Sequence, residues 1–127
     1  MKAVKPVVPD GPALDWKARN TRRADLLATW RQRQLPKILE ARGPIIAAAC
    51  DWRAGQIADR QAWFKDARDF YLSADTIQDY EDRAISQERA RHFGPLPKDE
   101  GTWQHQIGQC RAAILAGQRI DVEEEAA

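Results

Sequence analysis

Two cysteines and two histidines are the residues best suited to metal binding or nucleophilic catalysis. They are Cys50, His92, His105 and Cys110. A structural zinc site needs about four such ligands at short spacings, and no pair here forms C-x-x-C or H-x-x-x-H. His105 precedes Cys110 by five residues, which places the two side chains about 140° apart on a helix, too far for the imidazole to act as a base. We therefore expect two reduced, buried thiols and no zinc site.

Three aspartates share one face of a predicted helix. Asp75, Asp79 and Asp82 lie at i, i+4 and i+7, and paired acids line some metal-binding helical bundles. Those bundles also use a Glu-x-x-His motif, which this chain lacks, and Arg83 follows Asp79 by four residues, a pairing typical of a solvated face. The seven glycines form neither G-x-G-x-x-G nor the Walker pattern. We expect no metal, no cofactor and no catalytic residue, and hence no enzyme.

One face of the first predicted helix carries the strongest indication of binding. Plotted at ~100° per residue, basic and apolar side chains fall together within about a quarter-turn. The set is Arg19, Arg23, Leu26, Trp30 and Arg33, with Arg22 close by. Arginine suits phosphate contact through its planar fork and an indole can stack on a base, so the four arginines and Trp30 form a candidate nucleic-acid interface. Alternatively, the arginine stems cover a core while their heads stay in water.

Five tryptophans are a second indication of binding, because a bundle of this size has limited interior space for so many indoles. Tryptophan is rarely fully buried and is enriched in protein-binding hot spots. Trp16 and Trp30 are the candidates for partner binding, since they neighbour a proline-rich stretch and the basic residues. Trp52 and Trp63 are expected in the core.

Charge is distributed unevenly along the chain. Residues 1–43 contain ten basic and four acidic residues, whereas residues 44–127 contain ten basic and fifteen acidic ones. This asymmetry suits attraction between two parts of the protein, between two copies of it, or toward a polyanion. The net charge of only +1 weakens the nucleic-acid hypothesis, because nucleic-acid-binding domains are commonly strongly basic.

The elements that position these side chains are predicted to be helices. The five expected helices begin at a cap on Asp15, after Gly43, after Gly55, at a capping box on Asp75 and Gln78, and at a cap on Thr102. Pro36 kinks or restarts the first helix, and Gly94 and Gly117 end the last two. No period-two alternation occurs, so strands are not expected.

The predicted fold class is all-α, a small bundle of about five helices in a single domain at residues 15–119. An extended Pro-rich N-terminal arm (1–14) precedes it, because Pro6, Pro9 and Pro12 disfavour helix. An acidic C-terminal tail (120–127) follows it. No apolar run approaches the ~20 residues of a membrane span, and the N-terminus has no secretory h-region. A cytoplasmic location without membrane contact is expected.

Function is predicted from the arm, the uneven charge and the surplus tryptophans. We expect a non-catalytic helical interaction module, a small subunit or adaptor of a larger protein assembly, with another protein or a second copy as partner. The alternative is a nucleic-acid-binding or regulatory protein using the basic first helix. A second alternative is a protein inhibitor of a nucleic-acid-handling enzyme, which suits the acidic second portion of the chain.

Overall fold

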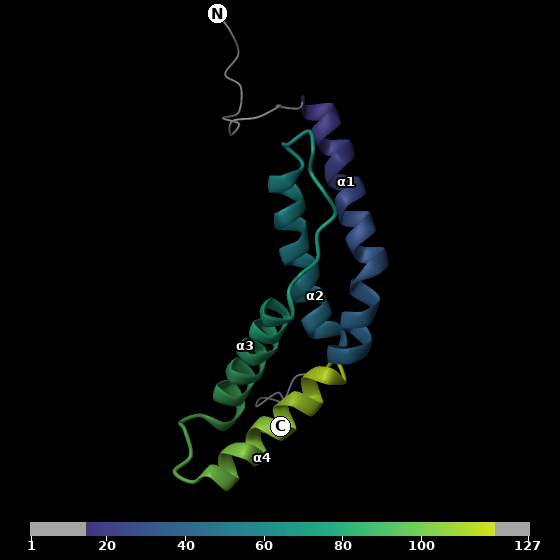
Figure 1. Ribbon diagram of the computed structural model, residues 1–127. Helices are drawn as coiled ribbons and strands as arrows, with labels where there is room; N and C mark the ends of the chain where they lie inside the picture. Colours follow the sequence, from purple (N-terminus) through teal and green to yellow (C-terminus); the bar gives the residue numbers. More distant parts are fainter. Residues whose placement is uncertain (1–14, 119–127) are drawn as a thin grey trace, which may run out of the picture.

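Four α-helices make up most of the part of the chain that this computed structural model describes, residues 15–118 (Figure 1). They are α1 (Trp16–Arg33), α2 (Leu35–Gln61), α3 (Ala74–Phe93) and α4 (Glu100–Leu115). No β-strand occurs over residues 15–118, so the all-α prediction is confirmed. The arm at 1–14 lies outside the described residues, as do the tail at 120–127 and the last residue of the expected domain.

The first two helices form an antiparallel hairpin, in which α1 and α2 lie side by side (Figure 1). Asp15 caps α1 as predicted, since its Oδ1 accepts a hydrogen bond from the Ala18 N–H at 2.7 Å. The chain turns at Gln34, and Pro36 stands in the first turn of α2, where its missing N–H would have no helical partner anyway. The predicted restart at Pro36 is therefore confirmed.

A kink divides α2 at Gly43, where the backbone is non-helical at φ 88° and ψ 173°. The next residue, Pro44, has no N–H to continue the helical ladder. The end of α4 packs against this point: a Cβ atom built on Gly43 would lie 2.9 Å from the Cα of Leu115. Glycine is thus needed at position 43 both for the positive φ and for the close approach of α4.

The expected third helix, from after Gly55 to residue 74, does not form. Instead α2 continues through Gly55 to Gln61, and residues 62–73 form turns and then an extended segment. A glycine inside a helix costs only about 1 kcal/mol. Burial offsets this cost, because Ala54 and Ala58 on either side of it are fully buried. In Figure 1 residues 62–73 run back along the α1–α2 hairpin toward α3.

The last two helices form a second hairpin, α3–α4, whose open end, where α3 begins and α4 ends, lies against α2 (Figure 1). The caps differ from those predicted. Ser73, rather than the box on Asp75, accepts from the Thr76 N–H to begin α3. Asp99 begins α4 by accepting from both the N–H and the hydroxyl of Thr102. Each true cap is thus a short polar side chain immediately before its helix.

The core runs along both hairpins. Its largest fully buried side chains are Trp30, Ile46, Cys50 and Cys110. The face that α2 buries beyond its kink is otherwise made of alanines, which lets α1 and the 62–73 segment approach closely. Among residues 15–118 no helix has the length and apolar character needed to cross a bilayer.

Candidate functional site

The first turn of α1 presents an exposed indole that its neighbours hold in place. Trp16 is 56% exposed, and its ring centroid lies 4.9 Å from that of Trp63 in an edge-to-face arrangement at 73°. The Arg19 guanidinium carbon stands 5.5 Å from the Trp16 centroid and 4.9 Å from the Trp63 centroid. Two aromatic faces therefore share one cation, an arrangement that stabilises both rings. We call Trp16, Arg19 and Trp63 the tryptophan cluster.

An acid on α2 anchors this cluster. Arg19 donates to the Asp59 carboxylate at 3.0 Å and to the Asp59 carbonyl at 3.3 Å, and Arg23 donates to the same carboxylate. The Arg19 side chain is only 13% exposed, and its Nε has no hydrogen-bond partner among the described residues. Arg19 is thus a largely buried cation whose neutralisation depends on one half-exposed carboxylate.

Two further arginines of α1 also bond to acids within the chain. Arg31 donates two hydrogen bonds to Asp51, at 2.7 and 2.9 Å, and these bonds raise the pKa of Arg31 above its ordinary value. Arg33 pairs with Asp69 at 2.9 Å. The structure therefore places most of the predicted arginine face against acids of α2 and of the 62–73 segment.

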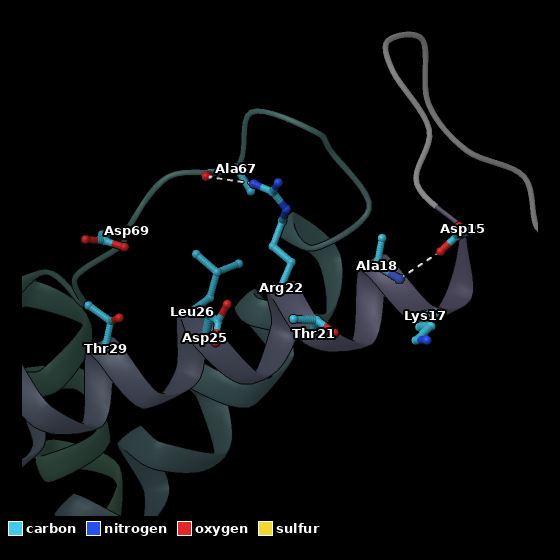
Figure 2. Close-up of a pocket in the computed structure, with 10 residues that line it drawn as sticks. All are labelled: Asp15, Lys17, Ala18, Thr21, Arg22, Asp25, Leu26, Thr29, Ala67 and Asp69. Atoms are coloured by element: carbon cyan, nitrogen blue, oxygen red, sulfur yellow. Dashed lines mark hydrogen bonds between the residues drawn. The ribbon is translucent and has the colours of Figure 1, made fainter.

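An open groove lies between α1 and the 62–73 segment (Figure 2). Its volume is about 570 Å³, and Arg22 reaches across it to the Ala67 carbonyl at 3.5 Å. Figure 2 shows Leu26 on its floor and Asp69 on its far wall. Side chains of both charges and two threonine hydroxyls line it, together with small apolar groups. Such a lining can hydrogen-bond a polar segment, but it contains no cysteine or histidine to serve as nucleophile or base.

Trp30, predicted to face a partner or a base, lies in the core at 1% exposure. Its Nε1–H donates to the Gln34 Oε1 at 2.6 Å. The same Gln34 oxygen accepts from the Leu72 N–H, and the Gln34 amide donates to the Leu72 carbonyl, both at 2.8 Å. Gln34 therefore fastens the 62–73 segment to the α1–α2 turn. Gln34 follows Trp30 by four residues, a spacing that favours contact on a helix, so the sequence indicates the Trp30–Gln34 hydrogen bond but not the bonds to Leu72.

Both cysteines, the candidates for thiol chemistry, lie in the core. Cys50 and Cys110 are free and fully buried, as predicted. Burial raises the pKa of both thiols, and the carboxylate of Glu88 raises that of Cys110 further. Among residues 15–118 no three or more histidines, cysteines or acids gather closely enough to hold a metal ion.

Two other tryptophans are placed differently from what the sequence suggests. Trp52, expected in the core, is 62% exposed, because it stands on the side of α2 opposite the buried alanines. Trp63 is partly buried in the tryptophan cluster.

No protein-family model, no curated protein and no solved structure matches this chain.

Proposed function

We propose that this protein is a non-catalytic helical interaction module, a small subunit or adaptor that binds another protein through the tryptophan cluster. The observation that carries the proposal is the exposed indole of Trp16, fixed by Trp63 and Arg19. A tryptophan side chain that is already ordered loses little conformational freedom on binding, and tryptophan is among the residues most enriched in binding hot spots.

The groove along α1 supports the same proposal, because it extends this surface. Asp15, Lys17 and Ala18, next to Trp16, line one end of it, and Thr29 lies at the other. A partner that covers Trp16 would meet a polar rim there, the usual surrounding of a hot spot.

The test compares Trp16→Ala with the matched control Leu96→Ala, which truncates another exposed apolar side chain in the α3–α4 loop. Both variants should keep wild-type helicity by circular dichroism. Affinity capture from the native host with mass spectrometry, followed by titration of the captured protein, should show binding roughly tenfold or more weaker for Trp16→Ala alone. Equal affinity of all three proteins would refute the proposal.

The nucleic-acid hypothesis and the protein-binding proposal predict different effects of salt on binding affinity. Phosphate contacts make affinity fall steeply as salt rises, whereas burial of an indole is nearly insensitive to it. The pairing of Arg19 and Arg23 with Asp59 and of Arg33 with Asp69 favours the protein partner, because those guanidinium groups already have carboxylate partners. Steep salt dependence of binding to single-stranded or duplex DNA or RNA would favour the alternative instead.

A further inference from the structure

The groove along α1 has two walls of different chemistry (Figure 2). One wall is a row of α1 side chains that follow one another at intervals of four residues along the helix. The row consists of Lys17, Thr21, Asp25 and Thr29. The other wall is the extended chain from Ala67 to Asp69. The groove therefore offers charged and hydroxyl groups on one side and protein backbone on the other.

The extended wall leaves backbone groups available for pairing. Among residues 15–118, no backbone-to-backbone hydrogen bond involves residues 68–72. The Ala67 carbonyl accepts from Arg22 at 3.5 Å, which is longer than an ordinary hydrogen bond. Asp69 presents its N–H and C=O on the same edge as Ala67, because the two edges of an extended chain alternate from residue to residue. An open edge of this kind can pair with an added strand.

The helical wall carries two opposite charges that the chain does not neutralise. Lys17 and Asp25 are both exposed, and neither takes part in an ion pair among the residues that the structure describes. They differ in this from Arg19, Arg31 and Arg33, which pair with acids. The eight residues from Lys17 to Asp25 correspond to about 12 Å along the helix axis. The groove is thus positive near Trp16 and negative farther along α1.

An extended peptide matches the spacing of the helical wall. Residues four apart on a helix rise by about 6 Å, and side chains on one face of a strand repeat about every 6.6 Å. Three successive side chains on one face of a strand therefore come level with Lys17, Thr21 and Asp25. Charge complementarity assigns an acid to the first of them and a base to the third, four residues away in the peptide.

We propose that the groove along α1 binds an extended segment of the partner protein, with an acidic residue at Lys17 and a basic residue four positions away at Asp25. The backbone of the segment pairs with the edge of residues 67–69 and takes the Ala67 carbonyl over from Arg22. The two charges fix the direction of the segment, because the reversed direction would bring like charges together. This inference rests on the proposed function, since it names the part of the partner that continues from the surface covering Trp16.

A displayed library of random peptides, selected on the full chain, tests the proposal. The selected peptides should carry an acid and a base four residues apart more often than the unselected library. Combining Lys17→Glu with Asp25→Lys exchanges the two charges at constant net charge, and should weaken binding of these peptides about tenfold. Exchanging the acid and the base within a peptide should restore its affinity for this variant. The control pair Lys37→Glu with Glu40→Lys, both exposed on α2, should leave the affinity unchanged.

Amide hydrogen exchange measured by NMR reads the backbone pairing separately. A bound peptide should slow exchange of the Asp69 amide roughly tenfold or more, while the exposed Leu96 in the α3–α4 loop should exchange as before. An unprotected Asp69 amide in the complex would overturn the pairing with residues 67–69. A selection without binders, or binders indifferent to the charge exchange, would overturn the assignment of the groove. The charge exchange leaves Trp16 in place, so this failure is distinguishable from a failure of Trp16→Ala to weaken binding of the captured protein.

Discussion

Replacing Gly43 by alanine should destabilise the protein more than any other single glycine substitution among residues 15–118. Two penalties coincide there. A φ of 88° with ψ 173° is strained for a residue with a Cβ, at about 1–3 kcal/mol. The added Cβ would also stand 2.9 Å from the Leu115 Cα and carbonyl carbon, which are backbone atoms that cannot rotate away. Displacing the end of α4 adds about 1–3 kcal/mol more, as overpacking commonly does.

Two other glycines separate these penalties. Gly94 has φ 78° but nothing within 4 Å of a built Cβ, so Gly94→Ala isolates the backbone strain. Gly55 has helical geometry and the same open space, so Gly55→Ala should stabilise the protein by about 0.5–1 kcal/mol.

The assay is urea unfolding followed by circular dichroism, with the free energy taken from the linear dependence on denaturant. We expect Gly43→Ala to lose about 2–6 kcal/mol, Gly94→Ala to lose about 1–3 kcal/mol, and Gly55→Ala to gain about 0.5–1 kcal/mol. A loss for Gly43→Ala no larger than that for Gly94→Ala would refute the close packing of α4 against the kink of α2.

Three further substitutions follow from single contacts. Gln34→Ala leaves the Leu72 N–H, the Leu72 carbonyl and an indole N–H without their partner, so urea unfolding should show a loss of about 3 kcal/mol. Asp59→Asn removes the charge that neutralises Arg19, and thermal unfolding should show a loss of about 1–2 kcal/mol, limited by the half-exposure of the acid. The raised pKa of Cys110 means that the unfolded thiol ionises before the folded one. Unfolding free energy should therefore fall as pH rises from about 8.5, the ordinary pKa of a thiol, toward the raised pKa of the folded Cys110, and Cys110→Ala should reduce this fall.

Matched controls make these three outcomes decisive. Gln32→Ala truncates an exposed side chain of α1 and should be nearly neutral; a loss as large as that of Gln34→Ala would contradict the role of Gln34. Asp69→Asn breaks the ion pair with Arg33, in which both side chains are about half exposed, and should lose less than Asp59→Asn. An unfolding free energy whose pH dependence is identical in Cys110→Ala and the wild type would contradict the thiol assignment.

The helix ends that depend on local residues were predictable from the sequence. Asp15 caps α1, and Gly94 ends α3 with a positive φ. The caps of the last two helices were displaced by two or three residues, because several short polar residues compete near each helix start and only the backbone path selects one. The sequence predicts a helix end at Gly55, but α2 continues through it, because the burial of Ala54 and Ala58 offsets the small cost of a glycine inside a helix.

The segment at 62–73 could not be predicted, because partners distant in sequence decide its structure. Its helical periodicity gives way to an extended path in which Gln34 satisfies the backbone of Leu72. The candidate site was predictable in part: Trp16 is a candidate for partner binding in the sequence because it neighbours the proline-rich stretch and the basic residues. The anchor of this site, Asp59, was not predictable, because it lies 40 residues away from Arg19 in the chain. An ion pair between residues so far apart in the chain leaves no periodic pattern in a single sequence.

Photo-crosslinking from the face of Trp16 tests the proposed function most directly. A photoreactive residue at Asn20, one turn along α1 from Trp16 and exposed, reports on whatever covers the tryptophan cluster in the native host. We expect an adduct to one partner protein, lost when Trp16→Ala is added and absent when the photoreactive residue is at Gln104 on α4 instead. Adducts to nucleic acid, or no adduct beyond that formed from position 104, would contradict the proposed protein-binding role.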